Sequence, residues 1–588
     1  MTSPLIKLKL CKSKPDLARL LRLDPVFLTR VVYIRNTENL YTDFSIKKKN
    51  GTNRIISAPD SELKEIQSKL SKLLQDCLDD IRESLELNNT ISHGFERKKS
   101  IITNAEKHKR RKWVLNLDLS NFFDEFNFGR VRGYFLKNKN FSLDETICNL
   151  IAKIACYKNR LPQGSPCSPV ITNLILLSLD QRLNKICKSL GCTYTRYADD
   201  LTISTNKLSF PKKIVTSHEN GSIILNKRFL NEIISSGFSL NERKIRLHNK
   251  TYRQEVTGLT VNEFVNVDAR YARKVRAMAH CLFNNGFFYL IDKKTRETRL
   301  GTINELTGML GFIDSLDKYN NKYILERTLQ HNNKDKKSEH NKREKLYAKF
   351  LYYKAFYANK RPMIITEGKT DITYLRVALN SLADSYPSLI EKKLVGSNSI
   401  CDYKLTFFKN SGKTKYFLNL EGGTGYLKDF LLKFDKKSKQ YKGNENMNPV
   451  IMILDNDSGS EGNGGIFSIL NGKSFPNITS SKDELRNKKW LWVIQNLYII
   501  FTPLNGAKDS SMEDLFDKET LDIKLGNNKA FNKTNNPCTE NQYGKEAFAT
   551  GVVLKQRENI NFSGFSSIFD SIVEIIEHHN NIKQNLLN

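Results

Sequence analysis

The chain has 588 residues, 39% of them hydrophobic, which supports folded cores in two to four domains of about 150 residues each. Its formal net charge of +31 indicates a polyanionic partner such as nucleic acid, bound with an affinity that falls as salt rises. No apolar run approaches the roughly 18 residues of a membrane span. The first residues lack a secretory signal, and the ten cysteines show no paired C-x-x-C spacing. We therefore expect a cytoplasmic protein with reduced thiols.

The N-terminal region is predicted to contain a strand followed by an amphipathic helix. Residues 54–59 form a β-prone run, and apolar side chains from Leu63 to Ile81 recur at helical spacing. A further apolar run at residues 114–117 is typical of a buried strand, and Asp118 closes it. The first acidic candidate therefore stands at the end of a strand.

Two further acids lie in a predicted hairpin downstream. Asp199 and Asp200 end the sequence Tyr-Ala-Asp-Asp, between β-prone runs at 194–197 and 201–204. Together with Asp118 they could gather carboxylates around two Mg²⁺ ions, which clamp the attacking and leaving oxygens of an in-line phosphoryl transfer. Taken alone, the acid pair favours an exposed turn, because Asp is common in turns.

Three more motifs accompany the acids in a fixed order. A proline-rich loop at residues 161–169 surrounds Gly164, whose backbone can approach a ligand closely. Phe123 follows the first acid, and residues 237–244 read Gly-Phe-Ser-Leu-Asn-Glu-Arg-Lys. This series resembles the palm of a reverse transcriptase.

The resemblance implies a role for each of these residues. Asp118 and Asp199 would hold two Mg²⁺ ions at the catalytic site, with Asp200 as a weaker or supporting ligand. Phe123 would exclude a ribose 2′-hydroxyl, and Lys244 would either protonate the leaving pyrophosphate or form a salt bridge. The remaining nucleotide and template contacts are assigned to Arg54, Gln163 and Gly164.

Two shorter motifs resemble the marks of bacterial retron reverse transcriptases. One is Asn-Ala-x-x-His, from Asn104 to His108, and the other is Val-Thr-Gly at residues 256–258. Enzymes of that family copy part of their own structured RNA from an internal guanosine 2′-hydroxyl and yield branched RNA–DNA. For His108, a helix residue paired with a backbone carbonyl is the structural alternative. The resemblance predicts RNA contacts from Asn104, His108, Val256, Thr257 and Gly258.

A basic helix is predicted at residues 268–280, with Val275 and Met278 as its apolar side. In the family this helix would belong to the thumb, which holds RNA or the growing duplex. A solvated helical face explains any single charge nearly as well. The charged residues assigned to RNA are Arg270, Arg273, Lys274 and Arg276.

Composition changes after the predicted thumb. Residues 330–345 are almost wholly polar and predict a linker. An aromatic helical pattern from Tyr347 to Phe356 then favours a docking face or part of a core. The predicted domains are a reverse transcriptase at 1–315 (fingers and palm to about 262, thumb at about 263–315), a charged linker at 316–346 and a second domain at 347–588.

Two continuous apolar runs in the second domain end in acids. Residues 363–366 lead into Glu367, and residues 450–454 lead into Asp455 and Asp457. Such runs suit strands buried on both faces of a parallel sheet, whose ligands bind beyond the carboxyl ends of the strands. The pattern resembles a TOPRIM domain, a metal-dependent module of topoisomerases, primases and nucleases.

The TOPRIM resemblance implies a second magnesium site. Asp455 and Asp457 would hold Mg²⁺, while Glu367 would bind metal or handle a proton. Glu513 could add a further nuclease acid or merely start a helix. The segment 421–425, Glu-Gly-Gly-Thr-Gly, could cradle a phosphate, although a glycine turn is the simpler interpretation. Phosphodiester hydrolysis needs only metal, acids and water, which favours a nuclease over a topoisomerase or primase.

Together these resemblances predict an α/β and α+β multidomain chain, with a right-hand polymerase fold followed by a TOPRIM-like Rossmannoid α/β domain. The expected function is a retron RNA-directed DNA polymerase fused to a Mg²⁺-dependent nuclease effector in bacterial antiphage defence. Its partners would be a cognate non-coding RNA, the branched RNA–DNA product, deoxynucleotides and the DNA or RNA that the nuclease cuts. A homo-oligomer is compatible with the sequence. Two other classes stay open, a group II intron-like mobile-element reverse transcriptase and an RNA–DNA-binding regulatory scaffold.

Overall fold

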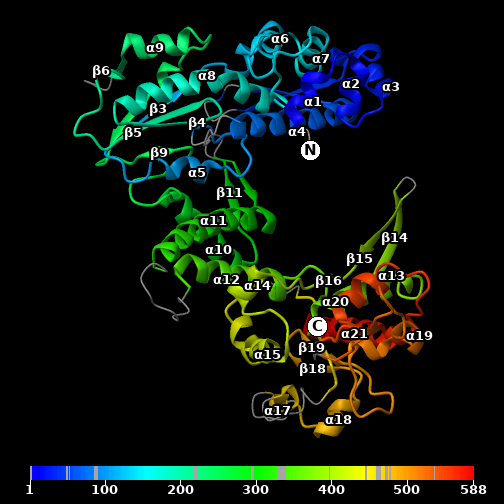
Figure 1. The fold of residues 1–588 in the computed structure, drawn as a ribbon. Helices are drawn as coiled ribbons and strands as arrows, with labels where there is room; N and C mark the ends of the chain where they lie inside the picture. Colours follow the sequence, from blue (N-terminus) through cyan, green and yellow to red (C-terminus); the bar gives the residue numbers. More distant parts are fainter. Residues whose placement is uncertain are drawn as a thin grey trace. The chain divides into compact units, whose positions relative to one another are not determined.

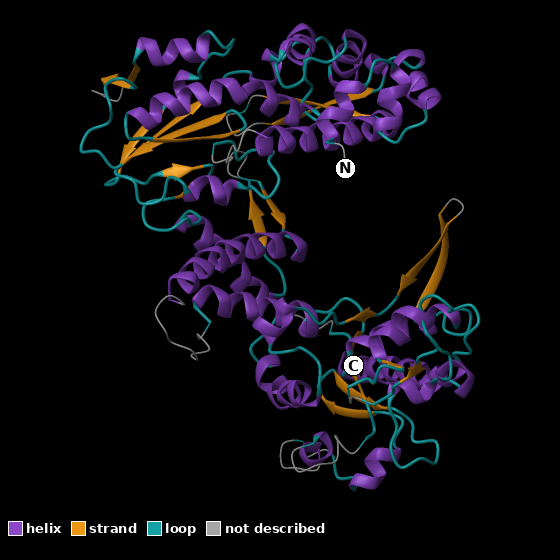
Figure 2. Ribbon diagram, viewed as in Figure 1, coloured by secondary structure: helices purple, strands orange, loops and turns teal. Residues whose placement is uncertain are grey.

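The computed structural model divides the chain into two units. One contains Met1–Ala269 and Leu316–Asn332, and the other contains Arg270–Ser315 and Asn333–Asn588. Figure 1 shows the order of the elements, and Figure 2 shows how helix and strand are mixed in both units. The structure describes residues 3–47, 51, 53–84, 91–217, 223–292, 297–328, 340–395, 398–443, 447–457, 465–470, 475, 478–534 and 537–587.

An antiparallel four-stranded sheet forms the centre of the N-terminal unit. Its strand order is β4-β5-β3-β8, with β3 (Trp113–Asp118) and β5 (Asp200–Thr205) in the middle. β4 (Thr193–Tyr197) and β8 (Arg246–Asn249) form the edges. The predicted strand before the first acid and the predicted hairpin around the acid pair are therefore confirmed, and they are neighbours in one sheet.

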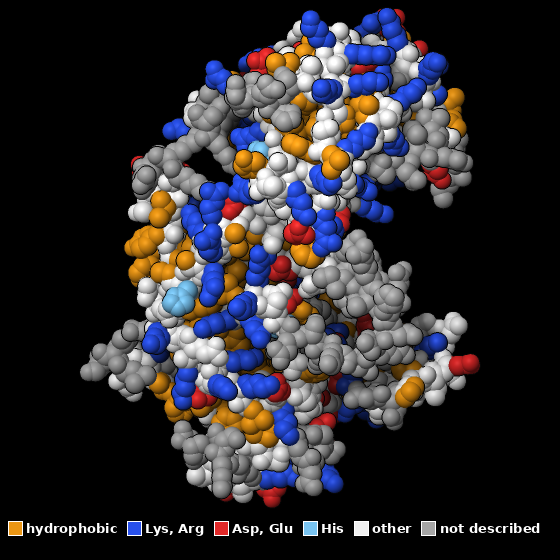
Figure 3. All heavy atoms as spheres, turned by 90° about the vertical axis from the view of Figure 1, so that its left-hand side faces the viewer, with side chains coloured by type: hydrophobic (Ala, Val, Ile, Leu, Met, Phe, Trp, Pro, Cys, Tyr) orange, Lys and Arg blue, Asp and Glu red, His pale blue; other side chains and the backbone are white. Residues whose placement is uncertain are grey.

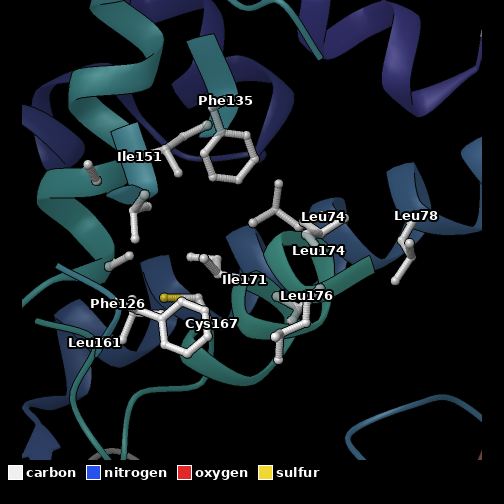
Figure 4. Close-up of a cluster of buried hydrophobic side chains, with 14 of the residues drawn as sticks. Leu74, Leu78, Phe126, Phe135, Ile151, Leu161, Cys167, Ile171, Leu174 and Leu176 are labelled. Carbon is white, nitrogen blue, oxygen red and sulfur yellow. The ribbon is translucent and has the colours of Figure 1, made fainter. Parts of the chain in front are cut away.

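Helices pack around this sheet and form a large hydrophobic core. α4 (Ser61–Ser84) buries the apolar positions that its predicted spacing identified, including Leu63, Ile66 and Leu70. α8 (Ser168–Ser189) begins with Pro169 in its first turn, where the missing N–H of proline costs nothing. Figure 4 shows side chains of α4, α6 (Phe128–Lys137), α7 (Glu145–Ala155) and α8 meeting in the core.

The predicted strand at residues 54–59 is also present, as β2 (Asn53–Pro59) in a hairpin with β1 (Tyr41–Lys47). The other elements of this unit are α1 (Pro4–Leu10), α2 (Lys14–Leu20), α3 (Pro25–Thr29), η1 (Arg30–Ile34), η2 (Thr37–Asn39), α5 (Ile101–Glu106), η3 (Phe122–Glu125), β6 (Val215–Ser217), β7 (Ile224–Leu225), α9 (Lys227–Ile234), η4 (Glu242–Lys244), β9 (Glu255–Val256) and β10 (Leu259–Thr260).

A five-stranded sheet forms the centre of the C-terminal unit, in the order β16-β13-β17-β19-β18. β13 (Met363–Thr366), β17 (Val450–Leu454) and β19 (Leu497–Phe501) are parallel neighbours, which confirms the prediction of a parallel sheet. All three strands are buried along their whole length, because helices cover the sheet. α13 (Lys369–Ser381) and α21 (Ser566–Leu587) contribute to the core on one face.

Further described elements of this unit are β11 (Tyr289–Ile291), β12 (Thr298–Leu300), η5 (Tyr353–Tyr357), β14 (Ile390–Val395), β15 (Asn398–Tyr403), β16 (Thr406–Phe407), α14 (Gly412–Leu418), α15 (Thr424–Ser438), α17 (Ile466–Leu470), α18 (Lys482–Asn487), β18 (Leu491–Ile494), η6 (Met512–Leu515), α19 (Lys518–Leu521), β20 (Ala530–Phe531), β21 (Gln542–Tyr543), α20 (Lys545–Ala547), η7 (Phe548–Val553) and η8 (Ser563–Phe565). Among the described residues, no helix is long and apolar enough to cross a membrane.

The predicted thumb helix packs with the C-terminal unit. It is present as α10 (Ala269–Asn285), and Val275 and Met278 are buried as expected. Near its end, the Phe283 ring lies 5.5 Å from that of Tyr353 and 5.4 Å from that of Tyr441. The Phe283 carbonyl also accepts a hydrogen bond from the Lys442 N–H at 2.9 Å. The domain boundary predicted at residue 315 therefore separates α10 from the residues against which it packs.

The predicted linker at 316–346 is largely helical where the structure describes it. α11 (Ile303–Thr328) continues through its first part, and α12 (Lys342–Tyr352) begins before its end. α11 extends into the predicted linker because Leu306, Leu310, Ile313 and Leu316 are buried at helical spacing. Residues 329–339 lie outside the described part of the chain. The aromatic pattern after residue 346 forms core, since Tyr347, Phe350, Tyr353 and Phe356 are buried.

Candidate active sites

Three acids meet at one end of the antiparallel sheet. Asp118 is the last residue of β3 and lies opposite Asp200, the first residue of β5. The Asp199 carbonyl accepts a hydrogen bond from the Leu119 N–H at 3.0 Å. The hairpin is tight because Ala198 takes a left-handed conformation, with φ of +57°. The fold thus brings together the three residues that were predicted to form the polymerase site.

The electrostatics of these acids favour a bound cation. Burial raises the pKa of Asp199, and the neighbouring Asp118 raises it further. The pKa of Asp200 rises to about 7, because surrounding protein desolvates its carboxyl and both other acids repel its charge. Lys244 Nζ lies 2.7 Å from Asp118 Oδ2, which is the predicted salt bridge. The Lys244 ammonium group shows that a positive charge is stabilised beside these carboxylates. The three carboxylates are therefore ligands that fit Mg²⁺.

The residues assigned to the nucleotide lie on two elements. Phe123 belongs to η3 and is half-buried, with its ring 6.4 Å from that of Phe95. Arg54 is exposed on β2, and its charge lowers the pKa of Asp199. Both side chains are at least partly accessible, and their roles toward the nucleotide stay predictions.

The proline-rich loop packs against strand β2. The Gln163 carbonyl accepts a hydrogen bond from the Ser57 N–H at 2.8 Å. Gly164 has φ of +130°, and a Cβ there would lie 2.4 Å from the Ser57 carbonyl oxygen. The glycine is therefore needed for close packing against β2, and the contacts of Gln163 and Gly164 with template or nucleotide stay predictions.

A buried ion pair holds the acidic hairpin, and sequence reasoning missed it. Arg196 is fully buried and lies 2.7 Å from Asp180 Oδ2, through Nη2. Its Nη1 donates to the Ala198 carbonyl at 3.2 Å and to Asn173 Oδ1 at 3.1 Å. The only sign of this ion pair in the sequence is an arginine inside a β-prone run. Its partner, Asp180, lies on the preceding helix α8 and carries no motif.

The Asn-Ala-x-x-His residues are buried scaffolding. His108 Nδ1 lies 2.7 Å from Ser204 Oγ, and His108 Nε2 lies 2.7 Å from Thr195 Oγ1. Asn104 Oδ1 accepts a hydrogen bond from the same Thr195 hydroxyl at 2.6 Å. Both side chains are fully buried. The predicted RNA contacts of Asn104 and His108 are therefore wrong for this conformation, because the two side chains tie α5 and the turn that follows it to β4 and β5.

Val-Thr-Gly forms the tight turn between β9 and β10. Thr257 and Gly258 have φ of +48° and +80°, which is the pattern of a type I′ hairpin. Val256 is fully buried, and Thr257 Oγ1 donates to the Ile101 carbonyl of α5 at 3.2 Å. The predicted RNA contact of Val256 is likewise wrong for this conformation, and Thr257 joins the turn to the helix that carries Asn104. On α10, Arg270, Arg273 and Arg276 are exposed and Lys274 is half-buried.

A second group of acids lies at the carboxyl ends of the parallel strands. Glu513 is 1% exposed, with Oε2 at 3.1 Å from Lys545 Nζ and no hydrogen-bond partner for Oε1. Asp455 Oδ1 accepts the Met512 N–H at 3.0 Å. Thr424 Oγ1 donates to Glu367 Oε1 at 2.6 Å, and Glu367 Oε2 is buried without a partner. The predicted Glu367, Asp455 and Glu513 therefore belong to one cluster.

This cluster holds more negative charge than its surroundings neutralise. Burial raises the pKa of Asp455 to about 8, and Asp371, Glu367 and Glu513 repel its charge further. Burial and the same acidic neighbours raise the pKa of Asp371 to about 6. The orphaned buried oxygens and raised pKa values fit a divalent cation, which would supply the missing positive charge.

Two members of the cluster were not predicted as site residues. Asp371 caps α13, accepting the Gly368 N–H at 2.7 Å, and only its closeness to Glu367 in sequence could have indicated it. Lys545 is far from the other members in sequence and carries no motif. Asp457 ends a described segment just before residues 458–464, and its metal role stays a prediction.

The glycine-rich segment 421–425 packs onto the second acid cluster as a turn. Gly422 and Gly423 have φ of +103° and +85°, and the Gly423 N–H donates to the Glu367 carbonyl at 3.0 Å. Across the described ranges, no three His, Cys, Asp or Glu side chains are already arranged to hold a metal ion.

The palm sheet, its three acids and the hairpin that presents them define a polymerase of the reverse-transcriptase class. The reverse transcriptase (RNA-dependent DNA polymerase) family matches residues 46–261. The retron Ec86 reverse transcriptase of Escherichia coli is 31% identical over 314 residues, which cover 53% of this chain and 86% of that protein. This chain belongs to the retron reverse transcriptase family.

The match to a second retron relative covers a smaller share of that relative's length. The retron Mx162 reverse transcriptase of Myxococcus xanthus is 33% identical over 303 residues, covering 48% of this chain and 59% of that protein. A solved telomerase from Candida albicans, in complex with a fragment of telomeric RNA, covers 53% of this chain and 56% of its own, with 11% identity and a TM-score of 0.29.

Proposed function

We propose that the N-terminal unit synthesises DNA on a cognate structured RNA, starting from an internal guanosine 2′-hydroxyl and giving branched RNA–DNA. The observation that carries the proposal is the convergence of Asp118, Asp199 and Asp200 at one end of the sheet, in a chain of the retron family. The same acids could serve another nucleotidyl transfer, but the family match favours an RNA template.

Each palm residue has a chemical task in this proposal. Asp118 and Asp199 would hold Mg²⁺, which supplies Lewis acidity for phosphoryl transfer when bound. Lys244 neutralises Asp118 in the free protein, and it would interact with the leaving phosphates. Phe123 would contact the sugar and disfavour a ribonucleotide. Arg54 would meet the triphosphate, since it is exposed and acts electrostatically on Asp199.

The test is the nucleic acid that copurifies with the chain expressed together with its flanking DNA. After RNase treatment, we expect the wild-type protein to yield a discrete short DNA that debranching enzyme shifts on a denaturing gel. Asp199→Asn should lower the yield by about a hundredfold or more, because it removes several kcal/mol of transition-state stabilisation. Asp79→Asn, which alters a half-exposed acid on α4, is the control. Undiminished DNA from Asp199→Asn would refute the metal assignment.

For the C-terminal unit we propose a Mg²⁺-dependent phosphodiesterase of TOPRIM type, which the RNA–DNA product restrains until phage infection. The cluster of Glu367, Asp371, Asp455 and Glu513 supports this, because Glu367 Oε2 and Glu513 Oε1 are buried without hydrogen-bond partners and the charge of the cluster is under-neutralised. Asp455, with Asp457, would hold the ion. Glu367, fixed by Thr424, would orient or deprotonate the attacking water.

Variants of this cluster should separate the two activities. We expect Glu367→Ala or Asp457→Ala to abolish Mg²⁺-dependent cleavage of plasmid DNA and structured RNA, and to leave the yield of branched DNA unchanged. The control is Glu391→Ala, a half-exposed acid on β14. Wild-type protein that cuts neither substrate when freed of its RNA–DNA, or a Glu367→Ala protein that still cuts, would contradict the nuclease assignment.

A further inference from the structure

An exposed aromatic and basic surface lies beside the two retron motifs. We call it the platform and define it as Arg110, Lys250, Tyr252, Arg253 and Phe264, all in the N-terminal unit. Tyr252 is 67% exposed and Phe264 is 45% exposed. The Arg110 guanidinium lies over the Phe264 ring, 5.0 Å from its centroid. Tyr252 stands between the basic residues Lys250 and Arg253 in the sequence, and exposed rings among cations are typical of surfaces that bind single-stranded nucleic acid.

The platform is held rigidly by hydrogen bonds between three segments. The Asn262 amide group donates to the carbonyls of Lys250 at 3.2 Å and Tyr252 at 2.8 Å, and its oxygen accepts the Gln254 N–H at 2.9 Å. Arg110 joins a third segment to these two, because its N–H donates to the Val261 carbonyl at 2.9 Å. The two rings are therefore presented on fixed backbone, which limits the entropy lost when a ligand binds.

The two retron motifs hold in place the segments that carry the platform. Arg110 follows the buried His108 by two residues, and the Val-Thr-Gly turn lies between the segments that carry Tyr252 and Phe264. Thr257 bonds the turn to α5. The buried motif residues thus position exposed neighbours, which explains how scaffolding residues can matter for a ligand that they do not touch.

Backbone strain coincides with the cation of the platform. Arg110 has φ of +56°, a left-handed conformation that a residue with a side chain rarely adopts. Its Nε also donates to the Glu263 carbonyl at 3.0 Å, which helps to fix it there. Strained residues that the surrounding structure holds in place are found preferentially at binding sites.

Charge identifies the kind of ligand. Glu263 pairs with Arg110 and Lys250, while Arg253 pairs with Glu255 and Asp268. Arg110 and Lys250 share the single carboxylate of Glu263, so this part of the platform keeps one excess positive charge. Figure 3 shows basic side chains spread widely over one face of the molecule. A polyanion with stacking groups matches both the cations and the rings.

We propose that the platform binds an unpaired stretch of the RNA template, with bases stacked on Tyr252 and Phe264 and phosphates at Arg110 and Lys250. The proposal rests on the proposed function, in which an RNA serves as template. Single-stranded RNA is favoured over a duplex, because paired bases have no free faces for the rings. It is favoured over a protein partner because of the positive charge.

The test compares two RNA probes by fluorescence anisotropy on the full chain. One is a blunt RNA hairpin, and the other is the same hairpin with a ten-nucleotide unpaired 3′ tail. We expect Tyr252→Ala and Phe264→Ala each to weaken binding of the tailed probe by about 5-fold to 150-fold, the range for one stacked base. Binding of the blunt hairpin should change by less than about twofold. Leu208→Ala, which truncates a side chain that is 88% exposed in the same unit, is the control.

Arg110→Gly provides a variant that keeps the fold, since glycine adopts the left-handed conformation without strain. We expect an unchanged or higher melting temperature, weaker binding of the tailed probe and a salt dependence reduced by about one phosphate contact. Equal affinities of the ring variants and wild type for the tailed probe would overturn the proposal. Equal losses for both probes would overturn it too, because stacking would not be the cause. Failure of wild-type protein to extend a primed RNA template would instead count against the proposed function.

Discussion

His108 is a neutral histidine in the core of the palm. Both ring nitrogens lie 2.7 Å from hydroxyls, on Ser204 and Thr195. Burial, followed by the charge of Arg111, lowers its pKa from 6.5 to about 3. The folded protein therefore excludes a proton that the unfolded chain binds below about pH 6.5.

This residue should make the N-terminal unit sensitive to mild acid. Because the folded pKa lies below the unfolded one, the contribution to stability is complete above about pH 6.5 and declines towards pH 3. At pH 5 the loss is roughly 2 kcal/mol. We expect His108→Gln, which keeps a polar side chain, to lose this part of the pH dependence. Urea unfolding at pH 8 and pH 5 measures it, and equal differences in the two proteins would contradict the assignment.

At the scale of elements, the spacing of apolar residues predicted the helices and strands that depend on local sequence. The helix from Leu63, the strand closed by Asp118 and the parallel strands before Glu367 and Asp455 are all present. In each case the apolar spacing alone specifies which face is buried. The carboxyl ends of the strands then place the acids, so the centres of both sites could be predicted without coordinates.

Side-chain contacts between different elements could not be predicted in this way. Arg196 and Asp180 meet only because β4 packs on α8, and Lys545 reaches Glu513 across 32 residues of sequence. The motif residues Asn104 and His108 were assigned to RNA because a family motif does not distinguish a side chain that touches a ligand from one that supports it. Burial decides that question, and burial depends on the tertiary fold.

At the scale of the whole chain, the two domains predicted from the sequence differ from the two units of the structure, because residues 270–315 belong to the C-terminal unit. Gly286, just after α10, and Gly443 cross so closely that a Cβ on Gly443 would lie 2.0 Å from the Gly286 nitrogen. Together with Phe283, Tyr353 and Tyr441, this crossing attaches the predicted thumb to the C-terminal unit. A nucleic acid held on the basic face of α10 would therefore be held by the body that contains the second acid cluster.

A single methyl group should loosen this attachment. We expect Gly443→Ala to destabilise the C-terminal unit by about 1–3 kcal/mol, because backbone must move to admit the Cβ. Hydrogen exchange should show faster exchange of α10 amides, while the palm strands β3 and β5 keep their protection. Gly425→Ala is the matched control, since its Cβ meets nothing within 4 Å. Unaltered protection of α10 in Gly443→Ala would show that the crossing does not hold the helix.

Helix α11 begins in one unit and ends in the other, with the division near Ser315. This division limits where the gene could recombine with another gene. A recombination event that joined this polymerase to a different C-terminal domain at the boundary predicted at residue 315 would split one helix and leave α10 without the aromatic side chains that cover it. A viable chimaera would need its crossover before α10, and the incoming segment would have to supply a second half of α11 that still fits the resident palm. The two units are therefore expected to be inherited together.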